Sequence, residues 1–231
     1  DSDFTIVESA RAQATGYSFP SGHTQNAVGT FGGIARFTKH RWVRCAAIAA
    51  AVLVPVSRMY LGVHTPLDVG VAAVTAVVLV LALYPPMERS EEEPRVMAVT
   101  LAVMLALAAG YLLFVSLYPF PADVDAANLA SGVENAWKLL GATAGMLLGW
   151  WLDVKYIHFK TEGAWYVQAV KLVGGLALLL GIRAALKAPL AALLGAGMGG
   201  AVRYAVVVLF AAAVWPLAFA SLRRAMEKQK K

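Results

Sequence analysis

The chain has 231 residues, of which 59% are hydrophobic and only 15% are charged, and its mean hydropathy is +0.64. This composition lies outside that of soluble domains and predicts an integral membrane protein. The net charge of +6 comes without a basic stripe interleaved with aromatic residues, which argues against nucleic acid as a partner. Cys45 is the single cysteine, so an internal disulfide is excluded, and its place in an apolar run predicts a small helix-packing residue.

The first polar stretch at the end of an apolar segment is Pro20-Ser21-Gly22-His23. Polar groups beside a membrane span are costly, so they call for a functional explanation. Ser21 is suited to cap a helix that runs to about residue 37, and this leaves the amides of Gly22, His23 and Thr24 at the positive helix end. Free amides at a helix N-terminus predict an anion site.

The second polar stretch runs from Ser57 to Asp68. Arg58 supplies a permanent cation whose planar fork suits phosphate oxygens. His64 and Asp68 are four residues apart, which lets the carboxylate orient the imidazole. A structural alternative is a capping box between Thr65 and Asp68. With Arg58 and His64 alongside, the functional interpretation is favoured, and one carboxylate can serve both purposes.

The apolar segments predict an all-α fold, a polytopic transmembrane helical bundle with about seven spans. The expected spans cover residues 21–37, 46–56, 65–84, 96–118, 137–152, 165–182 and 202–222. Pro85 and Pro86 are expected to end the third span, and the charged link after them divides residues 1–92 from the additional helices of residues 93–231, whose role is unknown. Gly195 to Gly200 is expected to be a flexible turn.

Basic residues predict the orientation in the membrane. The turn between Arg36 and Arg44 is compact and basic, which is typical of the cytoplasmic side. Fourteen of the twenty Lys and Arg residues fall on that side of the expected spans and six on the other. We therefore expect a multi-pass protein of the cell membrane with both polar stretches on the extracytoplasmic face.

At these two stretches the sequence resembles the type 2 phosphatidic acid phosphatase family. That family's second motif reads Pro-Ser-Gly-His, and its third reads Ser-Arg, five residues, His, and Asp four residues later. Both are matched in order, which is a specific signal. The family's first motif, a Lys followed after several residues by Arg-Pro, is not found upstream of Pro20. The sequence also opens without an initiator Met, so we expect an N-terminally truncated fragment.

The resemblance implies hydrolysis of a phosphate monoester or diphosphate from a phosphorylated membrane lipid through a phosphohistidine. A neutral imidazole can attack phosphorus, which makes His64 the expected nucleophile, with Asp68 on its other nitrogen. His23 is expected to protonate the leaving oxygen and later to activate water. The expected phosphate-binding residues are Arg58, Ser21 and Gly22. No metal or other cofactor is expected, because the acidic residues lack ligand spacing.

Other interpretations stay open. A phosphotransferase could use the same site, and a non-catalytic binding or transport protein could retain the fold. The superfamily is shared with vanadium haloperoxidases, but those are soluble proteins, so this interpretation ranks low. A less favoured interpretation gives Arg183, Lys187 and Arg203 a part in binding an anionic headgroup.

Overall fold

The computed structural model describes residues 19–159 and 165–219, which are helical apart from short connections and contain no strand. The predicted all-α fold is therefore confirmed over the described residues. The α-helices are α2 (Gly22–Phe37), α3 (Arg41–Tyr60), α4 (Pro66–Arg89), α5 (Pro94–Leu117), α6 (Ala126–Leu152), α7 (Trp165–Ala185) and α8 (Lys187–Leu209). Two single π-helical turns, η1 (Asp153–Ile157) and η2 (Phe210–Val214), extend α6 and α8.

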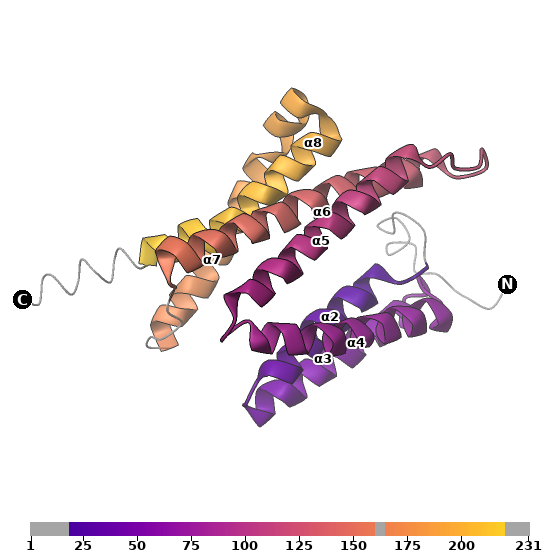
Figure 1. The fold of residues 1–231 in the computed structure, drawn as a ribbon. Helices are drawn as coiled ribbons and strands as arrows, with labels where there is room; N and C mark the ends of the chain where they lie inside the picture. The colour runs from indigo at the N-terminus through magenta and orange to yellow at the C-terminus, as the bar shows by residue number, and fades with distance from the viewer. Residues whose placement is uncertain (1–18, 160–164, 220–231) are drawn as a thin grey trace, which may run out of the picture. The chain divides into compact units, whose positions relative to one another are not determined.

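The helices form two compact units, one ending at Glu93 and the other beginning at Pro94. In unit 1, α2 packs against both α3 and α4 (Figure 1). In unit 2, α6 packs against α5 and α8, and α7 packs against α8.

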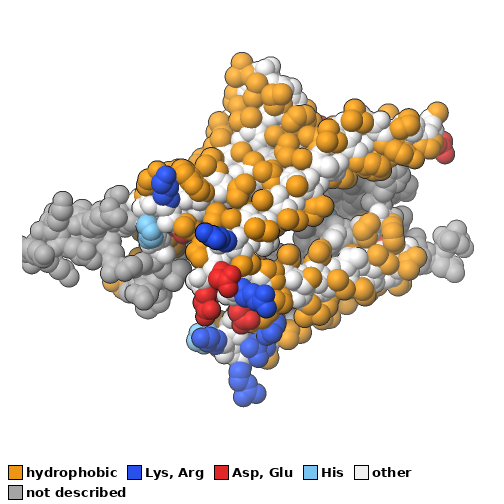
Figure 2. All heavy atoms as spheres, in the orientation of Figure 1, with side chains coloured by type: hydrophobic (Ala, Val, Ile, Leu, Met, Phe, Trp, Pro, Cys, Tyr) orange, Lys and Arg blue, Asp and Glu red, His pale blue; other side chains and the backbone are white. Residues whose placement is uncertain are grey.

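Five of the described helical segments are long and apolar enough to cross a membrane, which supports a multi-pass membrane protein. Figure 2 shows apolar side chains over most of the visible surface of each unit, as expected for helices that face lipid. The five candidate spans are fewer than the seven predicted from the sequence. With 16 residues, α2 falls short of a full span, and α6 carries polar residues along its first turns.

The helix α4 begins after Thr65 as predicted, but it ends later than the sequence prediction. It runs through Pro85 and Pro86 to Arg89, so the prediction that the prolines end it is wrong. A proline removes its own N–H donor but keeps its carbonyl group. Here the amide of Ser90 donates to the carbonyl oxygen of Pro86 at 3.0 Å, so the last turn still closes.

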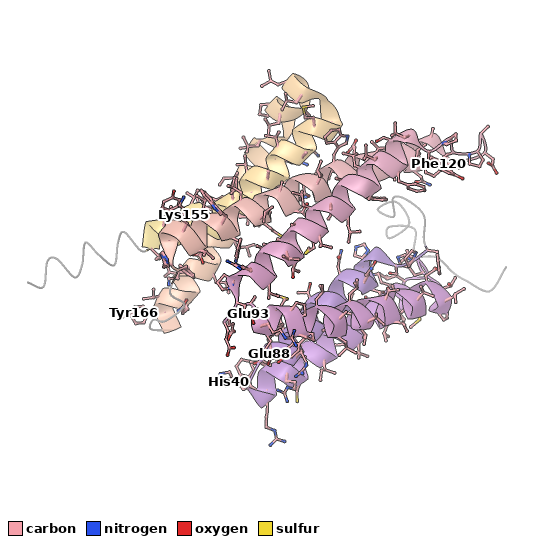
Figure 3. All side chains as sticks on the ribbon, in the orientation of Figure 1. His40, Glu88, Glu93, Phe120, Lys155 and Tyr166 are labelled. Carbon is pink, nitrogen blue, oxygen red and sulfur yellow. The ribbon has the colours of Figure 1, made fainter. Side chains whose placement is uncertain are left out.

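The basic turn between α2 and α3 closes one end of unit 1. The guanidinium of Arg44 donates to the carbonyl oxygens of Thr38, at 2.8 Å, and Ala35, at 3.2 Å. It thus provides hydrogen-bond donors for carbonyl groups at the C-terminal end of α2. Acidic and basic side chains gather at this end (Figure 2), and Figure 3 shows His40 and Glu88 there. Cys45, expected to pack between helices, is exposed instead.

Unit 2 depends on close contact between α6 and α8. A side chain on Gly141 would overlap the carbonyl group of Ala201. A Cβ on Gly145 would lie 2.8 Å from the carbonyl oxygen of Ala205. Both pairs are sixty residues apart, so the two helices run in the same direction. This register brings the N-terminal part of α6 beside the helical segment that follows Gly195.

The glycine-rich segment of α8 is a packing element, so the prediction of a flexible turn from Gly195 to Gly200 is wrong beyond its first residue. Only Gly195, at φ 76° and ψ 168°, leaves the helical conformation. It divides α8 into a short first helix and a long second one. Gly199 is buried against the carbonyl group of Leu190, where a larger residue would clash.

Candidate active site

A tight turn at the end of α3 brings His64 back toward Arg58. The amides of Leu61, Gly62 and Val63 donate to carbonyl oxygens of the last turn of α3 at 3.0, 2.9 and 3.3 Å, and the acceptor of Val63 is Arg58 itself. Gly62 has φ 67°, a left-handed conformation that glycine adopts without strain. The chain therefore reverses within a few residues and enters α4.

Ser21 ties the first polar stretch to the second. Its amide donates to the carbonyl oxygen of Asp68 at 3.2 Å, which fixes the start of α2 on the first turn of α4. Its hydroxyl accepts from the amide of Thr24 at 3.4 Å, which confirms the predicted N-cap. The amide of Thr24, expected to be free for an anion, is therefore used by the cap. The amides of Gly22 and His23 come before that of Thr24 at the same helix end.

Asp68 makes the capping box that the sequence left as an alternative. Its Oδ2 accepts from the amide of Thr65 at 2.8 Å, and its own amide donates to the Thr65 hydroxyl at 3.2 Å. The same Oδ2 lies 3.7 Å from Nδ1 of His64, and the Asp68 side chain is only 7% exposed. The cap thus fixes the carboxylate beside the imidazole, at a separation slightly longer than a hydrogen bond.

The hydrogen bond from Ser21 to Asp68 joins the two polar stretches, and the electrostatic environment of His23 agrees with this placement. Burial, followed by the positive charges of Arg58 and His64, lowers the pKa of His23 from its ordinary 6.5. His23 lies in the first turn of α2, outside the five candidate spans. The structure thus brings together Ser21, Gly22, His23, Arg58, His64 and Asp68, the six site residues predicted from the sequence.

Most of the buried side-chain polar atoms that lack a hydrogen-bond partner lie in this site. Among the described residues there are four such atoms, and three belong to Thr24, Arg58 and His64: Oγ1, Nε and Nδ1, respectively. An unpaired buried polar group costs about 1–3 kcal/mol, so each such atom calls for an explanation such as a bound water, a ligand or a catalytic role. The fourth atom is Nε of Arg203 in unit 2.

Thr24 is the one site residue that the sequence did not single out for its side chain. It is fully buried, like Ser21, and its unpaired Oγ1 lies one residue beyond His23. A signal was present in the sequence. Thr24 follows the cap residue by one turn and lies on the helix face that also holds Ala27 and Val28, so its hydroxyl must be buried with these apolar residues.

The described residues hold no group of three or more His, Cys, Asp or Glu side chains that could bind a metal. His40 and His158 lie outside the site: His40 precedes α3 at the charged end of unit 1, and His158 follows η1 in unit 2. The polar groups of the site are therefore two imidazoles, a guanidinium, a carboxylate, hydroxyls and helix-end amides.

This arrangement defines a multi-pass helical membrane protein with a partly buried polar cluster that contains two histidines and an arginine. Comparison with known proteins agrees: residues 2–92 match the PAP2 superfamily, and residues 137–228 match the transmembrane extension of PAP2 superfamily phosphatases. The chain belongs to the PAP2 superfamily.

Among curated proteins, an undecaprenyl-diphosphatase of Sulfolobus acidocaldarius is 47% identical over 55 residues. The match covers 24% of this chain and 26% of that protein, so the chain spans about a quarter of the length of this relative. No solved structure matches the chain.

Proposed function

We propose that the protein hydrolyses a phosphate monoester or diphosphate of a membrane lipid at the extracytoplasmic face, through a phosphohistidine at His64. The observation that carries this proposal is the unpaired buried Nε of Arg58 near the N-terminal end of α2, together with the placement of Nδ1 of His64 against Asp68. Family membership supports the reaction class.

Binding of the phosphoryl group uses positive charge and directed donors. Arg58 offers the edge of its guanidinium, which suits two phosphate oxygens at once. The amides of Gly22 and His23, at the N-terminal end of α2, add donors and a favourable helix dipole. Ser21 acts mainly through its backbone geometry in this proposal, because its side chain is fully buried and caps the helix.

In the first step, Nε2 of His64 attacks phosphorus, because Nδ1 is the nitrogen that faces Asp68. The new N–P bond forms as the P–O bond to the lipid breaks. The imidazolium of His23 gives its proton to the departing oxygen. Asp68 stabilises the positive charge that develops on His64, as the carboxylate does in other acid-base-nucleophile triads.

In the second step, water attacks phosphorus and the N–P bond breaks. Neutral His23 accepts a proton from that water, so both histidines return to their starting states and inorganic phosphate leaves. The lowered pKa of His23 favours this step, because the neutral imidazole is the form that accepts a proton.

The relative from Sulfolobus acidocaldarius favours a polyprenyl diphosphate among the lipid substrates. With such a substrate, the bond that breaks joins the terminal phosphorus to the bridging oxygen, and the lipid leaves as its monophosphate. The extracytoplasmic orientation is supported by the excess of Lys and Arg on the opposite side of the spans.

Phosphate release from a lipid panel tests the function. The full-length protein in detergent should release inorganic phosphate from a polyprenyl diphosphate or a lipid phosphate monoester, and Arg58→Gln should not. If neither class releases phosphate, the hydrolase proposal is wrong. If labelled phosphate moves to an added lipid or sugar acceptor without inorganic phosphate appearing, the protein is a phosphotransferase.

A further inference from the structure

Arg203 is a partly buried cation within the transmembrane extension. It lies in α8, inside the candidate span Lys187–Phe219. It follows the break at Gly195 by eight residues, or about 12 Å along the helix axis. Its Nε is buried and has no hydrogen-bond partner. An ionisable residue within a candidate span is costly, so Arg203 calls for a functional explanation.

The described part of unit 2 provides no carboxylate for this cation, since no ion pair is formed with Arg203. Glu134 pairs with Lys138 at 3.3 Å. Asp125 caps α6, and Asp153 accepts from the amide of Phe159 at the other end of that helix. The counter-ion of Arg203 must therefore come from outside these residues.

The surroundings of Arg203 leave the donor-bearing edge of the guanidinium available. Its Cζ lies 5.4 Å from the centre of the Tyr204 ring, which is a cation–π arrangement and supplies no hydrogen-bond acceptor. Side chains on helices lean toward the N-terminus, so Arg203 leans toward the turn that holds Gly200. Lys138 is beside that turn: its Cγ lies 3.4 Å from where a Cβ on Gly200 would be.

We propose that Arg203, with Lys138 beside it, binds the phosphate group of an anionic lipid on the transmembrane extension. The unpaired Nε and an adjacent Nη form a fork that matches two phosphate oxygens. Lys138 lies close to the same turn of α8, but its ammonium is paired with Glu134, so Arg203 makes the main contact in this proposal. The lipid is either a bulk phospholipid or a phosphorylated polyprenyl lipid, because both present the same phosphate chemistry to the fork.

Extension of Arg203 to water would solvate the tip of the guanidinium but would leave its buried Nε without a partner. A long basic side chain that reaches the interface keeps its charged head solvated. Here Nε is buried, whereas Arg183 in the last turn of α7 is exposed. Arg183 therefore provides a matched control of the same residue type in the same unit.

Lipid-dependent thermal stability tests this site separately from catalysis. The full-length protein is used with Arg58→Gln and His64→Ala, so that hydrolysis does not consume the probe. Phosphatidylglycerol, a polyprenyl monophosphate, phosphatidylcholine and the uncharged prenol are titrated in neutral detergent. We expect Arg203→Gln to raise the half-saturating concentration of an anionic lipid at least about tenfold, and Arg183→Gln to change it less than about twofold.

The lipid classes separate the two sources of phosphate. A rise in melting temperature with phosphatidylglycerol identifies a bulk lipid, and a rise with the polyprenyl monophosphate alone identifies a substrate-like lipid. Without lipid, Arg203→Gln should melt no lower than its parent, since an unpaired cation is removed. If that variant does not purify, Arg203→Lys, which keeps the charge without the fork, should bind more weakly than its parent. Equal titrations for Arg203 variants and parent, or equal shifts with phosphatidylcholine, would overturn the proposal.

Discussion

One oxygen of Asp68 serves two neighbours: Oδ2 lies 2.8 Å from the amide nitrogen of Thr65 and 3.7 Å from Nδ1 of His64. The first contact is a hydrogen bond and holds the carboxylate in place. The second is an electrostatic contact that becomes stronger when His64 acquires positive charge on attacking phosphorus. The helix cap thus positions the carboxylate for the proposed chemistry.

Replacing Asp68 separates these two functions. In Asp68→Asn, the amide oxygen can still accept from the Thr65 amide, so the helix cap and the fold should persist. The negative charge beside His64 is lost. We expect kcat for lipid hydrolysis to fall at least about a hundredfold with little change in melting temperature.

The matched control for that variant is Thr65→Ala, which removes the hydroxyl of the capping box and keeps the carboxylate. It should cost about 1 kcal/mol of stability and reduce kcat only a few fold. A larger loss of kcat in Thr65→Ala than in Asp68→Asn would show that Asp68 acts only through the cap.

The pKa of His23 tests the electrostatic link between the two polar stretches. Burial and the charges of Arg58 and His64 place this pKa below 6.5. Removing a neighbouring cation makes the imidazolium easier to form, so Arg58→Gln should raise the pKa of His23. Because the chain has four histidines, NMR titration of ring carbons is feasible, with assignments from single His→Gln variants.

A conservative Arg58→Lys variant provides the control, because it keeps the charge and should leave the pKa of His23 close to that of the parent protein. If the pKa is the same in Arg58→Gln and in the parent, Arg58 does not act on His23. The shared site would then be wrong.

Contact between α6 and α8 gives a prediction about stability. In Gly141→Ala, the new Cβ would overlap the carbonyl group of Ala201, so the helices must separate. We expect a loss of about 1–3 kcal/mol, seen as a lower melting temperature in detergent. Gly132→Ala, in the same helix with open space around it, should be neutral or slightly stabilising. Equal effects of the two variants would contradict the close helix contact.

Local signals in the sequence predicted the helix caps at the candidate site well. The caps at Ser21 and Thr65 each depend on residues three positions apart, so the sequence contains all the information required. The motifs also lie at helix ends that meet in unit 1, as expected from consecutive helices of opposite direction. The hydrogen bond from Ser21 to the Asp68 carbonyl was not predictable, because it depends on how α2 packs against α4.

Helix boundaries, and features that depend on tertiary contacts, were predicted less well. The sequence ended α4 at its two prolines and started α6 eleven residues late, because Asp125 was not recognised as an N-cap. The glycines after Gly195 were interpreted as a turn, since glycine favours both turns and close packing. The burial of Thr24 could be predicted from its helix face, but the lack of a hydrogen-bond partner for its hydroxyl could not, because this depends on the neighbouring elements.

The orientation in the membrane is open to a labelling experiment. Cys45 is exposed and would react, so the background is Cys45→Ser. Lys39→Cys reports the basic turn, and Tyr60→Cys reports the site end, where Tyr60 is 85% exposed. Gly62 is less suitable for a cysteine because of its positive φ. An impermeant thiol reagent added to intact cells should label Tyr60→Cys alone.

Permeabilised cells provide the control, since both cysteines should then react. Labelling of Lys39→Cys alone in intact cells would reverse the proposed orientation and place the site in the cytoplasm.

The two histidines should fail in different ways when each is replaced by alanine. In the proposed mechanism His64 bonds to phosphorus, while His23 only moves protons. A lipid alkoxide is a poor leaving group and needs a proton, whereas p-nitrophenolate hardly needs one. His23→Ala should therefore lose much more activity on the lipid than on p-nitrophenyl phosphate, and His64→Ala should be inactive on both.

Rapid-quench trapping with labelled phosphate distinguishes the two roles directly. His23→Ala should accumulate an acid-labile phosphoenzyme, because activation of water is also impaired. His64→Ala should never become labelled. His40→Ala, at the charged end of unit 1 away from the site, is the matched control and should behave like the parent protein. A phosphoenzyme in His64→Ala, or equal losses on both substrates in His23→Ala, would refute the assigned roles.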